Sequence, residues 1–350
     1  MATSASINDS AADAVDQYRL AAAHGRGLAA FCADRGLDLD PIARSVGLDP
    51  QVFETLEATV SLDRFARMLE ALAALSRDEA FGLKFAERFQ LGGTGPFGYA
   101  MRSAAGLREQ MGFMVRHIGA NIDLAAASLE IDGDAARLRW AFPTLLLDTR
   151  QLGDFCLILI MRQIRGIMGP NWLAQSAKLT RPRDGAAPML RRAVCGRIAF
   201  GASENLLVVN ARDLATRNPD ADPILFQMMR DRCEALSSAR RGAQDLVMQV
   251  RDIALALFEF GPVTADSVAP KLGLSVRSLH RRLAAEGVTF QTVLDETRHA
   301  LSTRLLTGTD LPLQEISRRV GFAAQSSYTR SAMRWYGRPP SAVRAEARSP

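Results

Sequence analysis

The pattern of apolar and polar residues changes character near residue 240. Upstream of that point, apolar positions three and four residues apart predict amphipathic helices, and apolar runs bounded by turn residues predict strands. The predicted helices cover residues 61–72, 106–121 and 148–168. The predicted strands cover residues 124–131, 136–142, 177–180 and 206–209. Downstream the periodicity is helical throughout, so the sequence predicts an α+β domain followed by an all-α domain.

Individual residues sharpen some of these predictions. Ser61 is placed to cap the helix over residues 61–72, because its hydroxyl can accept from backbone N–H groups of the first turn. Asp132-Gly133-Asp134 is expected to join the first two strands as a hairpin, since these residues tolerate the positive φ of a tight turn. The helix over residues 148–168 is apolar over much of its surface, which places it at the centre of its domain.

A chain of 350 residues is long for one hydrophobic core, so more than one domain is expected. The joint is expected within Leu236-Ser-Ser-Ala-Arg-Arg-Gly-Ala243, where small and basic residues separate two helical patterns. We therefore expect a mixed domain at residues 15–235, a linker at residues 236–243 and a helical domain at residues 244–347. Residues 1–14 are rich in Ala, Ser and Asp and are expected to form a disordered tail.

No segment of the sequence is expected to cross a membrane. The longest apolar run, residues 155–161, ends at Arg162 after seven residues, whereas a membrane span needs roughly 20. The N-terminus carries Asp9, Asp13 and Asp16 and lacks the basic and apolar regions of a secretory signal. The expected location is the cytoplasm.

The four cysteines, Cys32, Cys156, Cys195 and Cys233, lie far apart, without a CxxC pair or a nearby His. This spacing predicts neither a zinc site nor a disulfide framework, and no nucleotide-binding loop is found, so no metal or cofactor is expected. Small buried thiols in a reducing cytoplasm are the simplest interpretation. A redox-sensing pair stays open, because thiols distant in sequence can meet in space.

A layout of two short helices separated by a glycine turn occurs twice in the helical region. The first copy covers about residues 262–284 and the second about residues 312–336. The glycines of the two turns, Gly273 and Gly321, supply a left-handed or otherwise tight backbone. This is the layout of helix-turn-helix units, which place their second helix in the major groove of DNA.

In the first copy, Thr264 is placed to cap the first helix and Ser275 to cap the second. The residues expected to face the core from the second helix are Val276, Leu279 and Leu283. The residues expected to read bases from the opposite side are Arg277, His280 and Arg281. Phosphate contacts are expected at the edges of that surface, from Ser278 and Arg282.

In the second copy, Pro312 fits the first helical turn, where a missing N–H costs little. The residues expected to face inward from the second helix are Tyr328, Ala332 and Trp335. The residues expected to read bases are Gln325, Ser326, Thr329 and Arg330. Gln suits adenine and Arg suits guanine, each through two parallel hydrogen bonds. Arg334 is expected to contact a phosphate.

Between the two copies, residues 290–306 predict one helix, about 25 Å long at 1.5 Å per residue. This length can hold two recognition helices near one DNA turn, about 34 Å, apart. The charge distribution agrees, because residues 240–350 carry 16 Lys and Arg against 10 Asp and Glu, whereas residues 1–239 carry 27 against 28. Of the 16 basic residues 15 are Arg, whose guanidinium fork matches phosphates and guanine edges. Double-stranded DNA is therefore the expected partner.

A set of residues in the helical region recurs at spacings typical of one family. The set comprises Arg281-Arg282-Leu283, Gly287, Phe290, Arg298, Leu305-Leu306, Glu315-Ile316, Val320-Gly321-Phe322, Arg330, residues 334–340 and Arg344. These residues resemble the AraC/XylS family of bacterial transcription regulators. The resemblance implies two helix-turn-helix units joined by a linker helix. By position, it puts the family's base-contacting sites on Arg277, His280, Arg281, Gln325, Ser326 and Arg330.

Four residues depart from the family's pattern. Ala332 stands where the family usually has Phe, which leaves a smaller core under the second recognition helix. Ser302 and Ser317 replace common Ala residues. Pro270 lies inside the first helix of the first unit and removes a helical hydrogen bond, so a kink is expected there.

The N-terminal region is similar to the arabinose-binding-type regulatory domain found in one branch of this family. The similar stretches are residues 47–50, 81–86 and 91–100. The similarity implies that residues 15–235 bind an effector, dimerise, or do both. It points to no particular sugar, and no effector-binding residue is predicted.

The expected function is that of a sequence-specific transcriptional regulator whose N-terminal domain senses a small molecule. The family leans towards activation, which implies RNA polymerase as a partner, and a homodimer would form through the N-terminal domain. Control by redox chemistry or by a protein partner is the alternative to a metabolite. An architectural DNA binder would not need the large α+β domain. A remote alternative, an alkyl-transfer repair enzyme with a DNA-binding tail, would need a reactive thiol such as Cys195, and no enzyme is expected.

Overall fold

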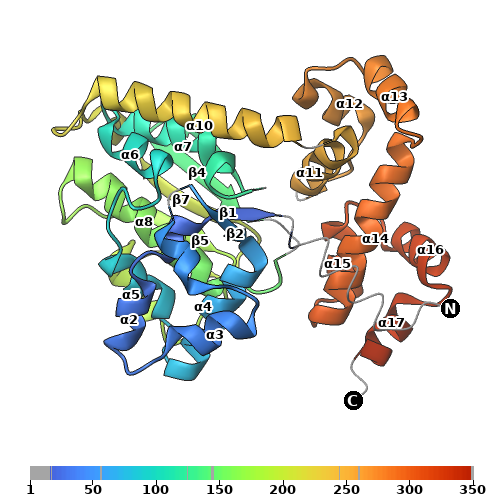
Figure 1. Ribbon diagram of the computed structural model, residues 1–350, viewed down its shortest axis with the longest axis horizontal. Coiled ribbons are helices and arrows are strands. Elements are labelled where there is room, and N and C mark those ends of the chain that lie inside the picture. Colours follow the sequence, from blue (N-terminus) through green and yellow to red (C-terminus); the bar gives the residue numbers. More distant parts are fainter. Residues whose placement is uncertain are drawn as a thin grey trace. The chain divides into compact units, whose positions relative to one another are not determined.

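The computed structural model describes residue 16 and residues 18–55, 57–123, 125–142, 146–243, 245–258 and 261–347. The chain forms two compact units (Figure 1). The N-terminal unit comprises Tyr18–Phe142 and Asp148–Ser238, and the C-terminal unit is built chiefly from Ala239–Pro350. The tail expected at residues 1–14 lies outside the described residues.

The N-terminal unit contains two sheets. The small sheet pairs β1 (Arg19–Ala21) with β2 (Thr59–Ser61) in antiparallel fashion. The larger sheet has the order β3-β4-β7-β5-β6, with only β5 and β6 parallel. Its strands are β3 (Ala126–Asp132), β4 (Ala135–Ala141), β5 (Ser176–Leu179), β6 (Ile198–Phe200) and β7 (Asn205–Asn210).

Period-two patterning fixes which face of the large sheet is buried. In β4, Ala136 and Leu138 are fully buried, while Arg139 lies on the other face. There Arg139 donates to Glu130 on β3 at 2.8 Å and to Glu204 before β7 at 3.0 Å. The hairpin predicted around Gly133 is present, with Gly133 at φ +55°.

Helices complete the N-terminal unit, and the last of them, α10, begins in this unit and ends beyond Ser238. The α-helices are α2 (Leu28–Ala33), α3 (Leu39–Ser45), α4 (Leu62–Ser76), α5 (Phe81–Arg88), α6 (Pro96–Ser103), α7 (Leu107–Asn121), α8 (Arg150–Met168), α9 (Ala187–Ala193) and α10 (Pro223–Ala243). The 3-10 turns are η1 (Ala22–Gly25), η2 (Pro50–Glu54) and η3 (Ala211–Ala215). The three helices predicted from periodicity correspond to α4, α7 and α8, and Ser61 caps α4 by accepting from Arg64 N at 3.2 Å.

The helix α8 occupies the centre of this unit, as its apolar surface predicts. It lies so close to α5 that a Cβ on Gly82 would come within 2.1 Å of the Gln151 carbonyl oxygen. The side chain of Gln151 accepts from Gly82 N at 2.8 Å and fixes this approach. Phe155 stacks on Phe85 with ring centroids 5.1 Å apart, and Phe89 packs edge-on against Phe155.

Two features of the N-terminal unit differ from the sequence-based expectations. The strands β1, β2 and β6 were not predicted, because three residues are too few to show a period. The segment at residues 236–243, expected as a linker, is helical, since α10 continues to Ala243. Ser, Ala and Arg are all compatible with a helix interior, and Gly242 comes only at the end of the helix, so the small and basic residues did not interrupt it.

Where the structure describes it, the C-terminal unit is all-helical. Its elements are α11 (Leu246–Phe258), α12 (Ala265–Val268), η4 (Ala269–Leu272), α13 (Val276–Ala285), α14 (Phe290–Gly308), α15 (Leu313–Arg319), α16 (Gln325–Tyr336) and α17 (Pro340–Ala347). The linker helix α14 runs from the first helix pair to the second (Figure 1). Its 19 residues span roughly 28 Å. The predicted apolar stripe is buried, at Val293, Leu294, Leu301 and Leu305. Within the described residues, no helix is long and apolar enough to span a membrane.

Candidate DNA-binding surface and effector cavity

The first helix-turn-helix is held by local hydrogen bonds that the sequence predicts. Thr264 and Ser267 form a reciprocal capping box at the start of α12, with the Ser267 N–H donating to Thr264 Oγ1 at 3.3 Å. The regular helix then ends, and the 3-10 turn η4 begins with Pro270 in its first turn. The α-helix thus stops before Pro270, where the sequence predicts a kink, and continues as a 3-10 turn. Gly273 makes the turn in the left-handed conformation, with φ +66°.

The recognition helix α13 has two distinct faces. Ser275 caps it by accepting from Ser278 N at 3.1 Å. Leu279 and Leu283 are fully buried, whereas Val276 is only half-buried. The exposed residues are Arg277, His280, Arg281 and Arg282. Within the described part of the chain, none of these arginine side chains has a hydrogen bond or ion pair, so α13 presents three unneutralised guanidinium groups.

Ser278 differs from its neighbours on α13. It is half-buried, and its hydroxyl accepts from the Ser275 hydroxyl at 2.9 Å. Its side chain therefore takes part in the cap of the helix.

The turn of the second helix-turn-helix needs glycine for two reasons. Gly321 adopts φ +75°, which favours glycine. A Cβ at this position would also come within 2.4 Å of the Phe258 ring of α11. Arg298 of α14 fastens the same turn from another side, because it donates to the carbonyl oxygens of Val320 and Gly321 at 3.2 and 3.0 Å. Its guanidinium lies over the Phe322 ring at 4.6 Å, and burial lowers its pKa.

The recognition helix α16 carries a more neutral surface than α13. Gln325, Ser326 and Arg330 are exposed. Thr329 is half-buried, and its hydroxyl donates to the Gln325 carbonyl oxygen at 3.0 Å. Arg330 donates to Ser327 Oγ at 3.3 Å. The helix starts at Ala324, which offers no side-chain cap, whereas α13 has Ser275.

Arg334 and Trp335 share one partner on the linker helix. Arg334 donates to Asp295 Oδ1 at 2.7 Å, and the Trp335 indole N–H donates to Asp295 Oδ2 at 2.9 Å. Trp335 is half-buried and stacks on His299, so it packs against α14 as the inward prediction requires. The Arg334 side chain is 64% exposed, which leaves it accessible in spite of its ion pair.

The serines that depart from the family pattern behave differently from each other. Ser302 lies between two tyrosine hydroxyls, 2.9 Å from Tyr328 and 2.9 Å from Tyr336. It therefore links α14 to α16 through a polar network, and Ala332 of α16 is fully buried. Ser317 Oγ is buried without a hydrogen-bond partner among the described residues.

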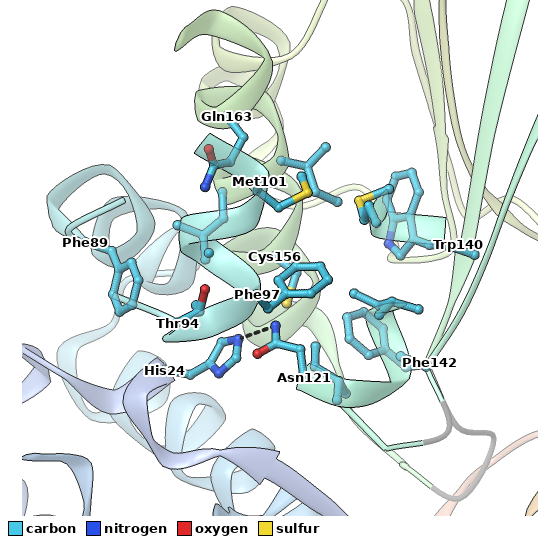
Figure 2. A pocket seen from close by; sticks show the side chains of 18 of the residues that line it. His24, Phe89, Thr94, Phe97, Met101, Asn121, Trp140, Phe142, Cys156 and Gln163 are labelled. Atoms are coloured by element: carbon cyan, nitrogen blue, oxygen red, sulfur yellow. Dashed lines mark hydrogen bonds between the residues drawn. The ribbon is translucent and has the colours of Figure 1, made fainter. Parts of the chain in front are cut away.

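The N-terminal unit contains a cavity that the sequence did not reveal (Figure 2). Its volume is about 70 Å³, whereas one water needs roughly 10–15 Å³, so it has room for a small molecule. The lining residues are His24, Phe89, Leu91, Gly92, Thr94, Phe97, Gly98, Met101, Met114, Ile118, Asn121, Ile122, Ala125, Ala126, Ala127, Trp140, Ala141, Phe142, Cys156, Leu159, Ile160 and Gln163. None of them carries a formal charge at neutral pH, since burial lowers the pKa of His24 to about 4.

A hydrogen-bond chain orients the polar end of this cavity. The Ala21 carbonyl oxygen lies 2.9 Å from His24 Nδ1 and can only accept, so Nδ1 carries the proton. Nε2 of the neutral ring is then an acceptor, and the Asn121 amide nitrogen donates to it at 3.2 Å. The Asn121 carbonyl oxygen Oδ1 is buried without a partner among the described residues. Figure 2 shows Gln163 well apart from this pair.

The four cysteines are free thiols distributed over the N-terminal unit. Burial raises the pKa of Cys32 to about 11 and that of Cys156 and Cys233 to about 12. Burial also raises the pKa of Cys195, which is 2% exposed. Because the thiolate is the reactive form, this favours the interpretation of Cys195 as a packing residue over that of an alkyl acceptor.

Comparisons with known proteins agree with both halves of the molecule. Residues 36–218 match the model described as the arabinose-binding domain of AraC transcription regulator, N-terminal, and residues 268–346 match a helix-turn-helix domain. The HTH-type transcriptional regulator VirS of Mycobacterium tuberculosis is 30% identical over 318 residues, which cover 89% of this chain and 92% of VirS.

Two further relatives span similar lengths. The ornithine utilization regulator of Pseudomonas aeruginosa is 26% identical over 92% of this chain and 95% of its own. An uncharacterized HTH-type transcriptional regulator of Mycobacterium tuberculosis is 28% identical over 88% of this chain and 91% of its own. The chain therefore belongs to the AraC/XylS family of transcriptional regulators, with an arabinose-binding-type domain followed by a DNA-binding helix-turn-helix domain.

Proposed function

We propose that α13 and α16 read the bases of a promoter or operator site, and that the N-terminal domain adjusts transcription to a small-molecule effector. The observation that carries the proposal is the construction of α13. Leu279 and Leu283 are buried under the helix, while Arg277 and Arg281 are exposed and have no ion-pair partner among the described residues. A positively charged face held rigidly by an apolar one is what a helix needs to dock in the major groove.

Within this proposal, α13 supplies most of the specific affinity. Arg277 and Arg281 contact guanine edges, His280 contacts a base beside them, and Arg282 contacts a phosphate. Ser278 contributes its hydroxyl to a phosphate from within the helix cap. These contacts require no existing interaction of the three arginines to be broken.

The second recognition helix, α16, discriminates less strongly between bases than α13 does. Gln325, Ser326 and Arg330 are exposed and reach bases directly, while Thr329 contributes from its half-buried position. Arg334 reaches a phosphate in exchange for part of its contact with Asp295. Because α16 offers fewer unpaired charges than α13, sequence changes in its half of the site cost less affinity.

The remaining parts of the proposal concern the response. We propose an activator that works with RNA polymerase in the cytoplasm, where promoter DNA is found, and that dimerises through the N-terminal domain. Membership of a family that leans towards activation supports the first part.

Ornithine, named for one relative, is a poor candidate effector here, because its ammonium and carboxylate groups would meet no charged residue in the lining of the cavity.

The test is substitution of the exposed arginines of α13 in the full-length protein. Arg277→Ala and Arg281→Ala should each weaken binding to the native promoter site by roughly 1–3 kcal/mol and relax the preference at one base position. Arg212→Ala is the matched control, since it removes the same charge from a residue of the N-terminal unit whose side chain is 84% exposed. Binding is measured by fluorescence anisotropy on a library of single-base variants. Unchanged affinity and base preference in both α13 variants would refute the assignment.

A further inference from the structure

The cavity of the N-terminal unit is unfavourable for charged groups on a ligand. Its lining is built from aliphatic, aromatic and small side chains, with His24, Thr94, Asn121, Cys156 and Gln163 as the polar exceptions. None of these carries a charge at neutral pH, because burial lowers the pKa of His24 to about 4 and raises that of Cys156 to about 12. A charged ligand group would lose its hydration here without gaining an ion pair.

Asn121 supplies this cavity with a hydrogen-bond acceptor whose direction is fixed. The backbone carbonyl of Ala21 holds the proton on His24 Nδ1, and His24 Nε2 in turn binds the Asn121 amide nitrogen. Asn121 therefore cannot reverse its amide without losing this hydrogen bond. Its Oδ1 is left buried and unpaired among the described residues, and an unpaired buried acceptor is unfavourable. A donor group on a ligand would satisfy it.

We propose that this cavity binds a small, uncharged and mainly apolar molecule that carries a hydroxyl or N–H group, and that this donor binds Asn121 Oδ1. The apolar part of the ligand lies between Phe97 and the strand residue Trp140 (Figure 2), and Ala127 belongs to the same lining. The chemical class is that of a medium-length or aromatic alcohol or a neutral amide. A carboxylate, an ammonium compound and a free sugar are outside it. This inference rests on the proposal that the N-terminal domain senses an effector.

The position of Trp140 in the lining provides a direct measurement. Bromine quenches indole fluorescence on contact, so brominated probes report occupancy of the cavity. The probes are 6-bromohexan-1-ol and 4-bromobenzyl alcohol, each compared with its carboxylate, 6-bromohexanoate and 4-bromobenzoate. Full-length protein should show saturable quenching with at least one alcohol, and the matching carboxylate should need at least tenfold higher concentration. Trp140→Phe should remove the saturable component, because Trp172 and Trp335, the other tryptophans, are not in the lining.

Two variants test the assignment to residues. Asn121→Leu keeps the size of the side chain and removes the acceptor, so it should weaken alcohol binding at least tenfold and reduce the preference for alcohol over carboxylate. Ala127→Phe fills the cavity from β3 and should abolish saturable quenching, even if Asn121→Leu fails to fold. Ser128→Phe is the matched control, because Ser128 is the next residue on β3, is exposed and is not in the lining. It should leave binding unchanged.

The outcomes separate the cavity from the wider function. Carboxylates that bind as tightly as alcohols, the absence of saturable quenching with both alcohols, or quenching that survives Ala127→Phe would each overturn the proposal. Promoter binding is measured on the same samples. Intact promoter binding without alcohol binding contradicts the cavity proposal alone. Selective alcohol binding that leaves promoter affinity and transcription unchanged supports the cavity proposal and contradicts the sensing role of the domain.

Discussion

At the scale of single residues, burial and neighbouring charges set the protonation states of the titratable side chains. His24 is 1% exposed and keeps a neutral ring, which fixes the direction of the Asn121 amide. Burial disfavours the charged form of both His24 and Glu70. It keeps the extra proton off the histidine ring, whereas it raises the pKa of the Glu70 carboxyl to about 7 and so favours its protonated form. Glu315 is held by Arg318 and Arg319, which lower its pKa to about 2. The protonation state of each group therefore depends on its surroundings in the fold, and the residue type alone does not predict it.

His24→Gln should make the N-terminal domain less sensitive to acid. The pKa of His24 is about 4 in the folded protein and about 6.5 in the unfolded chain. Between these values the unfolded chain binds the extra proton, so lowering the pH favours unfolding by up to about 1.4 kcal/mol per pH unit. Above pH 6.5 the ring is neutral in both states, and His24 does not lower the free energy of unfolding. As the pH falls from 6.5 towards 4, the free energy of unfolding decreases.

The measurement is urea unfolding at several pH values between 6.5 and 4, in a Trp335→Phe background. The remaining tryptophans, Trp140 and Trp172, then report only on the N-terminal domain. The slope of unfolding free energy against pH should be shallower in His24→Gln than in its parent. Equal slopes would contradict the assignment of a neutral, buried His24.

At the scale of elements, the two recognition helices begin in different ways. Ser275 caps α13, whereas α16 starts at Ala324 without a side-chain cap. Ala324 already has the extended backbone of a capping residue, with φ −138° and ψ 140°. The first turn of α16 therefore receives no hydrogen bond from a capping side chain, and helix N-termini favour phosphate groups.

Ala324→Asp should stabilise the C-terminal domain and weaken its binding to DNA. A capping carboxylate adds roughly 0.5–2 kcal/mol of stability, because it accepts from N–H groups of the first turn. Its charge then repels the phosphate that we expect at the same place. Ala324→Asn is the control, since it caps without charge and should lower DNA affinity less. Thermal unfolding and DNA-binding titrations at two salt concentrations measure both effects. Equal DNA affinity of the two variants would contradict a phosphate at this helix end.

Local signals in the sequence were enough to predict most elements of the DNA-binding domain. Capping by Thr264 and Ser275 and the turns at Gly273 and Gly321 depend on neighbours within a few residues, so a short stretch of sequence contains them. The role of Ser302 could not be found in this way. It depends on tyrosines 26 and 34 residues away, which only folding brings together.

At the scale of the whole molecule, the unpaired cationic surface and the uncharged cavity lie in different units. The three unpaired arginines of α13 belong to the C-terminal unit, while the uncharged cavity belongs to the N-terminal one. The cavity could not be predicted from the sequence, because its lining comes from η1, α6, α7, α8 and two strands, with segments in between. Each contributing stretch has the apolar residues of an ordinary core, and only their arrangement leaves space.

A fragment of residues 240–350 should bind promoter DNA without responding to the effector. The proposed base-reading residues and the helices that support them lie in this range, whereas the cavity lies outside it. Circular dichroism should show a folded helical fragment. Anisotropy titrations with and without a cavity-binding alcohol should then give the same affinity. A response of the fragment to the alcohol would place the sensing site in the wrong unit.

The position of α11 has a mechanical consequence. This helix packs against α12 and α13 of the first helix-turn-helix. Its last residue, Phe258, fits against Gly321 in the turn of the second helix-turn-helix. Arg298 binds that turn from α14, with its guanidinium 5.7 Å from the same Phe258 ring. One helix therefore contacts both helix-turn-helix units. We therefore expect a small shift of α11 to change how α13 and α16 are placed relative to each other, and so to weaken DNA binding without altering any of the proposed base-reading side chains.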